Sequence, residues 1–287
     1  MLLHARSYLD IGARVGLGGL KYDCNYGTTM PGYHAAFDVG YLYKSPYWIA
    51  FRLGATIESA SSSYRKAGYE DAYTVTDVEN ESMVVSYNIG LLRERHYTWS
   101  ASFPVQIGFH LQHFTVLVGP RFTLPIGGSW NQSIADAALA VYYPKYDNLV
   151  EESYPLAATR NFAVKDKGSL VLPAWHCAFA GEITYDFLIA SSYGKSESFI
   201  SVGLYFDVSL MTAPTYPNNE QYGILRLSET RDGFPLTRHN QPVLQAWREN
   251  NPLVASMRPF DVGIKVAYHL TSAPRQKRTK HGCNCDE

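Results

Sequence analysis

Apolar and polar side chains alternate along FDVGIKVAYHL, residues 260–270. Every second residue from Phe260 to Leu270 is apolar, and the other parity holds Asp261, Lys265 and His269. A two-residue period indicates a β-strand with one apolar and one polar face. The same alternation recurs, and the eight expected strands are 8–17, 33–43, 47–58, 99–111, 114–124, 175–187, 199–210 and 260–270. Each has about the 9–11 residues that a tilted strand needs to cross a bilayer.

The connections between these segments alternate in length. Those at 44–46, 112–113 and 188–198 are short, whereas 18–32 is longer and 59–98, 125–174 and 211–259 are very long. Outer-membrane barrels combine short periplasmic turns with long surface loops. We therefore predict an all-β fold, an eight-stranded antiparallel transmembrane β-barrel over residues 1–272, followed by a basic periplasmic tail at 273–287.

The polar parity of the expected strands mixes both signs of charge with glycine. Its charged members are Asp10, Arg14, Asp38, Arg52, Arg121, Glu182, Asp186, Asp207, Asp261 and Lys265. Opposite charges among glycines suit a cramped interior in which the charges must pair. The apolar parity ends in aromatic residues such as Trp99, Trp175 and Tyr268, as expected of interfacial girdles. The apolar face is thus expected to meet lipid and the charged face to fill the barrel.

An eight-stranded barrel is just wide enough for side chains to fill. We expect the charged residues to form a structural plug, with Arg121 and Glu182 paired near the centre; a narrow ion path is the alternative. His110, His176 and His269 share the polar parity and are expected to be satisfied interior histidines rather than metal ligands.

Composition narrows the classes of function. The 287-residue chain has a formal charge of −1, so no basic surface dominates and no nucleic-acid partner is expected. No apolar run reaches the ~18 residues of a transmembrane helix. The start, MLLHARSYLDIG, does not read as a secretory signal. The four cysteines lack the spacing of a zinc site, and we expect no metal or cofactor.

Several segments resemble the outer-membrane β-barrels of Bacteroidetes, including the N-terminal barrels of OmpA-type proteins. They are WSASFPVQIGFHL (99–111), VGPRFTLPIGG (118–128), YYPKYD (142–147), GLYFDVSL (203–210) and PFDVGIKVAYHL (259–270). The resemblance covers roughly residues 7–271. It implies a Gram-negative outer membrane with its lipid and lipopolysaccharide. An even strand count then places both termini in the periplasm. The peptidoglycan-binding domain of OmpA-type proteins is not expected here.

The long loops hold the strongest candidates for recognition. The aromatic residues expected to contact partners are Trp130, Tyr142, Tyr143, Tyr146, Tyr222, Phe234 and Trp247. SIADAALAVYY (133–143) and QPVLQAWREN (241–250) are expected to form short helical segments. No G-x-S-x-G or H-E-x-x-H spacing appears, so an outer-membrane lipid-modifying or proteolytic enzyme is the weakest reading. The leading expectation is a non-catalytic scaffold or interaction subunit that binds other outer-membrane proteins or surface lipoproteins; the second is a small-solute channel.

Overall fold

A computed structural model describes residues 6–76, 80–146, 148–149, 159–192, 196–211, 213–214, 223–228, 237–248 and 251–271. Besides one 3-10 turn, η1 (Pro144–Tyr146), its regular elements are all β-strands. No helix among these residues is long and apolar enough to cross a membrane. The strands are β1 (Arg6–Cys24), β2 (Thr28–Lys44), β3 (Ile49–Thr76), β4 (Ser82–Leu111), β5 (Phe114–Tyr143), β6 (Asn148–Leu149), β7 (Thr159–Ser169), β8 (His176–Ser192), β9 (Ser196–Ser209), β10 (Ala213–Pro214), β11 (Leu225–Ser228), β12 (Thr237–Asn240), β13 (Trp247–Arg248), β14 (Asn251–Pro252) and β15 (Val254–Thr271).

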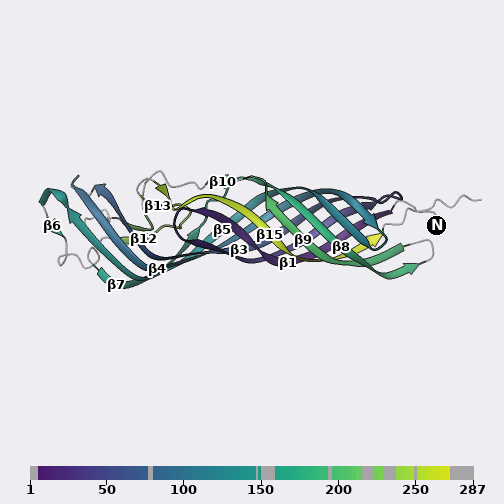
Figure 1. Cartoon of the computed structure of the whole chain (residues 1–287), viewed down its shortest axis with the longest axis horizontal. Helices are drawn as coiled ribbons and strands as arrows, with labels where there is room; N and C mark the ends of the chain where they lie inside the picture. Colours follow the sequence, from purple (N-terminus) through teal and green to yellow (C-terminus); the bar gives the residue numbers. More distant parts are fainter. Residues whose placement is uncertain are drawn as a thin grey trace, which may run out of the picture.

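Eight strands pair in a ring. The order is β1-β2-β3-β4-β5-β8-β9-β15, and β1 pairs antiparallel with both β2 and β15. Figure 1 shows these strands wound together in one half of an elongated molecule. Each of the eight expected segments overlaps one of them. The prediction of an all-β, antiparallel architecture is therefore confirmed.

The two faces of the ring differ as the alternation predicts. On β1, Asp10 and Arg14 are buried, whereas Val15 and Leu17 are 60% and 59% exposed. The same division holds on the other strands, with Leu204 at 64% and Ile183 at 53% exposed. We call the exposed apolar residues of the eight strands the outer band. The outer band extends around all eight strands, so its exposed apolar area is far larger than the apolar patches that soluble monomers expose to water.

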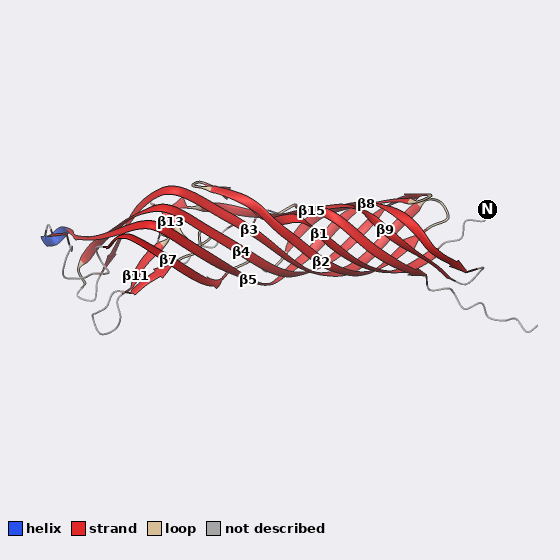
Figure 2. Cartoon of the chain, turned by 90° about the horizontal axis from the view of Figure 1, so that it is seen from below, coloured by secondary structure: helices blue, strands red, loops and turns tan. Residues whose placement is uncertain are grey.

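Three ring strands and β7 continue far beyond the ring. We define the sheet extension as residues 66–76 of β3, 82–98 of β4, 126–143 of β5 and all of β7; β7 pairs with β5. Figure 2 shows these strands running on from the ring to the end that carries η1. Residues 59–76, 82–98 and 126–143 were expected to lie in loops, so the boundaries of the 59–98 and 125–174 loops were wrong.

A line of irregularity explains why this region was misread. In β3, β4 and β5 the buried parity changes at Gly68, Gly90 and Asp136, which are neighbours across the sheet. Gly68 and Asp136 both have positive φ, 60° and 55°. The pairing register of β3, β4 and β5 is the same on both sides of these positions, but the buried face of each strand reverses, so a two-residue period read across them cancels.

The expected helical segments are also absent from the described chain. Residues 133–143 belong to β5, where Ile134, Leu139 and Val141 pack into a hydrophobic core. Residues 241–246 form one hydrogen-bonded turn, in which the Gln245 N–H donates to the Pro242 carbonyl, and β13 follows. In the expected 211–259 loop, 254–259 belong to β15.

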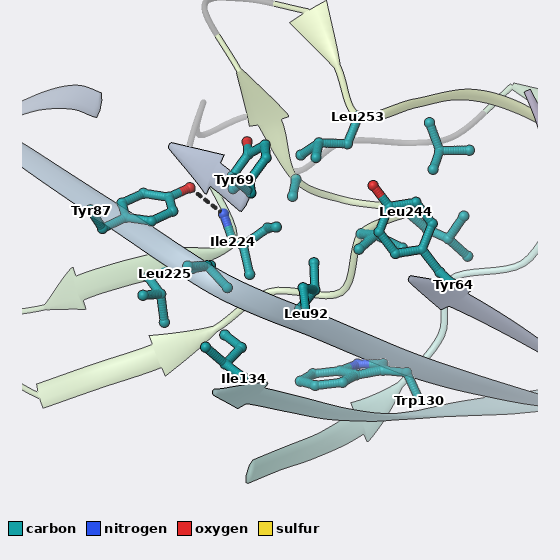
Figure 3. Close-up of a cluster of buried hydrophobic side chains, with 14 of the residues drawn as sticks. Tyr64, Tyr69, Tyr87, Leu92, Trp130, Ile134, Ile224, Leu225, Leu244 and Leu253 are labelled. Atoms are coloured by element: carbon teal, nitrogen blue, oxygen red, sulfur yellow. Dashed lines mark hydrogen bonds between the residues drawn. The ribbon is translucent and has the colours of Figure 1, made fainter. Parts of the chain in front are cut away.

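A second core lies on the concave side of the sheet extension. Its buried members include Tyr64, Tyr87, Ile134, Ile224 and Leu253 (Figure 3). Residues 223–225, 240–246 and 253–254 cover the sheet there, and we call them the cap. The extension thus has its own apolar core, separate from the charged interior of the ring.

Candidate functional site: the interior of the ring

The charged residues of the polar parity meet inside the ring. Arg14 on β1 and Arg121 on β5 both donate to the same Asp207 oxygen on β9, at 2.9 and 2.6 Å. Arg121 also pairs with Glu58 at 2.5 Å, and the Arg14 Nε lies 2.9 Å from Asp38. Only the Arg14–Asp38 contact joins neighbouring strands, β1 and β2; the other pairs join strands that are not adjacent in the ring, so these side chains bridge its interior. Each arginine has more than one carboxylate partner, as buried charges require.

A second group of charges lies beside the first. Arg52 donates to Asp10 at 2.5 Å, and Lys265 donates to Glu182 at 2.9 Å. The two pairs are joined because Lys265 Nζ is 3.7 Å from Asp10 and Arg52 Nη1 is 3.8 Å from Glu182. All four side chains are at most 7% exposed. The expected Arg121–Glu182 pair is not among these contacts: Arg121 lies in the first group and Glu182 in the second.

One cation of the interior, Lys44, is not among the charged residues that the sequence predicted there. Lys44 was expected in a short turn, yet it ends β2 and is buried, donating to Asp186 at 2.5 Å and to Thr115 at 2.9 Å. Ser201 also donates to Asp186, at 2.5 Å, and contacts His269 Nε2 at 2.8 Å. Leu42 interrupts the polar parity of β2, but Lys44, two residues later, has the same parity as Asp38. That shared parity is the sequence signal that places Lys44 inside the ring.

An apolar cluster closes the same end of the interior. It consists of Tyr8, Leu42, Ala50, Leu117 and Phe199, all buried. The Phe199 ring stacks on His269 with centroids 4.3 Å apart, and Lys44 Nζ lies 4.6 Å from the Phe199 centroid. Only a cavity of about 10 Å³ remains between this cluster and the charges, which is about the space of one water molecule.

A larger cavity, of about 50 Å³, lies between the charges and the second core, whose Leu20 and Met257 line it. His34, Glu58, His176 and Asp261 contribute its polar lining. His34 Nδ1 bonds to the Tyr205 hydroxyl at 2.6 Å, while His34 Nε2, His176 Nδ1 and Asp261 Oδ1 have no hydrogen-bond partner among the described residues. The cavity therefore has room and polar groups for a few water molecules.

The described residues contain no cluster of three or more His, Cys, Asp or Glu side chains suited to a metal ion. The expected interior histidines have separate partners. His110 Nε2 bonds to the Ser45 carbonyl at 2.9 Å, and His269 contacts Ser201. They are spread along the ring, and of these three histidines His176 lines the larger cavity, together with His34.

A buried polar group joins the cap to the sheet above this cavity. Glu94 accepts from Gln132 Nε2 at 2.6 Å and from the Val243 N–H at 3.0 Å, and it contacts His96 Nε2 at 2.5 Å. His96 in turn contacts the Tyr22 hydroxyl at 2.5 Å. Burial raises the pKa of Tyr22 well above its ordinary value. These hydrogen bonds tie the cap to β4, β5 and β1.

The aromatic residues expected to recognise partners differ in position. Trp130 is buried in the second core (Figure 3), so it was wrong as a surface candidate. Tyr142 and Tyr143 are half-buried, and Tyr146 in η1 is 57% exposed. Tyr222 and Phe234 lie outside the described residues, and only the backbone of Trp247, in β13, is described.

The interior of the ring thus holds an apolar cluster, two groups of paired charges and a polar cavity. No model of a known protein family matches the chain, and no curated protein matches it.

Proposed function

We propose that this chain is an integral outer-membrane β-barrel of a Gram-negative bacterium that acts as a non-catalytic scaffold or interaction subunit. The observation that carries the proposal is the inverted ring, apolar outside and charged inside, with a large folded sheet at one end only. In this reading the outer band faces lipid, the sheet extension stands at the cell surface, and both ends of the chain lie in the periplasm.

The dimensions of the outer band support membrane insertion. On β4 it runs from Leu111, 58% exposed, to Trp99, 55% exposed. At ~3.3 Å per residue this is ~40 Å along the strand, or roughly 30 Å across a bilayer at the tilt of about 40° usual in such barrels. That matches the hydrocarbon thickness of a membrane.

The filled interior argues against a channel as the main role, because an open pore needs a continuous wet path. The sheet extension favours interaction instead. Among the described strands, β7 pairs only with β5, and 66–76 of β3 pair only with β4. Both edges therefore offer backbone groups to which a partner strand can add.

Insertion is tested by placing a charge on each surface. Leu204→Lys puts a charge in the middle of the outer band and should cost about 2–4 kcal/mol of folding in lipid vesicles. Ser86→Lys, on the exposed face of the sheet extension, should be neutral within about 0.5 kcal/mol. Equal effects in the two variants would exclude a lipid-facing outer band.

The scaffold role is tested by photo-crosslinking in native outer membranes. Crosslinkers at Glu70 and Ala163, exposed on the two edge strands of the extension, should capture a protein in stoichiometric amounts, whereas one at Leu204 should capture lipid. If none of the three crosslinkers captures a protein, the scaffold role is contradicted. Single-channel conductance would then test the alternative role as a channel.

A further inference from the structure

The outer face of the sheet extension carries a basic trough next to the outer band. Arg93 and Arg95 project from β4, and Lys165 and Lys167 project from β7; all four are exposed. β5 lies between these two strands and presents Asn131 and Ser133 at the same level.

The strand register sets the shape of this trough. Arg95 and Lys167 are both register partners of Asn131, and Arg93 and Lys165 are both partners of Ser133. Two strand spacings, about 10 Å, therefore separate a ridge of arginines from a ridge of lysines. The floor consists of short polar side chains. A tetrahedral anion fits between such ridges, and arginine can bind it with two hydrogen bonds.

Within the described part of the chain, no carboxylate balances the charges of the trough. None of the four has a carboxylate within ion-pair distance among the described residues, and Arg65 adds a fifth positive charge directly opposite Arg93. Like charges in facing positions destabilise a sheet. Asp166 alternates with Lys165 and Lys167 along β7 but accepts hydrogen bonds from the Asn240 and Lys167 backbone N–H groups instead. Binding of an anion from outside the chain would therefore stabilise the trough.

The position of the trough indicates where that anion comes from. The outer band and its continuation end at Trp99 on β4, at Ile126 on β5 and at Val171, two residues after β7, and these residues are 55%, 67% and 54% exposed. Arg95 lies four residues from Trp99, and Lys167 lies four residues from Val171. Four residues span ~13 Å along a strand, or roughly 10 Å across the membrane at the usual tilt. The headgroup layer is about 5–8 Å thick on each side of the hydrocarbon, so these long side chains need to extend only a few Å back along the strand to meet it.

We propose, on the basis of the membrane barrel described above, that the trough binds the phosphate groups of a phosphorylated glycolipid in the outer leaflet. The phosphates lie between Arg95 and Lys167, with Arg93 and Lys165 beyond them. The acyl chains pack against Trp99, Leu124 and Ile126. An acidic protein surface would use the charges but would leave these exposed apolar residues without a partner.

The test uses the full chain in nanodiscs of phosphatidylcholine with a small fraction of phosphorylated lipid A, and native mass spectrometry of the lipid that stays bound. Arg95→Ser/Lys167→Ser should weaken retention roughly 30-fold, since each basic group near an anionic surface contributes about fivefold. Lys21→Ser/Arg258→Ser is the matched control. It removes two exposed, facing cations from β1 and β15 and should leave retention unchanged.

Three results would overturn the proposal: unchanged retention in the trough variant, equal losses in both variants, or equal retention of lipid A without its phosphates. Loss of a crosslinked protein, rather than lipid, from the trough variant would assign the charges to a protein partner. Quenching of tryptophan fluorescence by brominated lipid is measured on the same samples. Quenching without lipid A retention refutes only the trough, whereas absence of quenching refutes the membrane barrel itself.

Discussion

Arg14 and Asp207 are 193 positions apart in the chain, yet the Arg14 Nη1 donates to the Asp207 Oδ2 at 2.9 Å across the interior of the ring. The same oxygen accepts from Arg121 at 2.6 Å. One carboxylate on β9 therefore ties β1 to β5. Because it accepts hydrogen bonds from two arginines, loss of the Asp207 charge removes a partner from both of them.

Asp207→Asn should destabilise the folded ring by about 3–5 kcal/mol, the usual cost of leaving a buried charge without its partner. Urea titration in detergent micelles, followed by the gel shift between folded and unfolded forms, measures the free energy of unfolding. Asp23→Asn, at an exposed position of β1, is the control and should change it by less than about 0.5 kcal/mol. An Asp207 variant as stable as this control would show that the interior charges are solvated.

The alternation of side chains was sufficient to locate the ring strands, because a ring with one apolar and one polar face must repeat every two residues. It also identified which residues point inward, from Asp10 on β1 to Lys265 on β15. The partners could not be predicted, since they depend on which strands face each other across the interior. Arg121 and Glu182 share a parity but belong to different groups of charges.

The sheet extension was missed for a different physical reason. Its strands alternate regularly on either side of Gly68, Gly90 and Asp136, but the buried parity reverses at these positions. The buried Glu94, His96 and Gln132 lie in this region and were not singled out from the sequence. Their roles depend on the cap, which comes from a distant part of the chain.

Tyr87→Phe should loosen the cap without affecting the ring. The Tyr87 hydroxyl donates to Asp71 at 2.9 Å and accepts from the Ile224 N–H at 2.8 Å (Figure 3). Removing it leaves a buried N–H without a partner, which costs about 1–3 kcal/mol. Hydrogen exchange at residues 223–228 should therefore become faster by the corresponding factor.

Tyr146→Phe is the matched control for that experiment. The Tyr146 hydroxyl contacts Glu81 at 2.5 Å at an exposed site, so its removal should leave exchange at 223–228 unchanged. Equal exchange rates in the Tyr87 variant and the wild type would mean that Tyr87 does not hold the cap.

The cap should also open at alkaline pH. Burial raises the pKa of Tyr64 and Tyr87 above the ordinary value of about 10. Below pH 10 these phenols are protonated in both the closed and the open cap, so their stabilising effect is complete. Above pH 10 they ionise only in the open cap, and each costs up to about 1.4 kcal/mol per pH unit.

Limited proteolysis between pH 8 and pH 11, combined with phenolate absorbance, measures this transition. Cleavage within the cap should rise above pH 10, and the Tyr87→Phe variant should show a smaller rise. A cap that is cut equally at pH 8 and pH 11 would contradict the burial of these tyrosines.

Gly263 should be intolerant of even a methyl group. It faces Gly16 across the β1–β15 pair that completes the ring, and a Cβ at Gly263 would lie 2.2 Å from the Val15 carbonyl oxygen and 2.5 Å from the Gly16 Cα. Both contacts are with backbone, which cannot move without separating the strands. Gly263→Ala should therefore cost about 1–3 kcal/mol through overpacking and lower the yield of folded protein in refolding from urea. Gly127→Ala, where no atom lies within 4 Å of the added Cβ, should fold as well as the wild type. If the two alanine variants refold equally, β1 and β15 do not pair closely at this point, and the closure of the ring would have to be reconsidered.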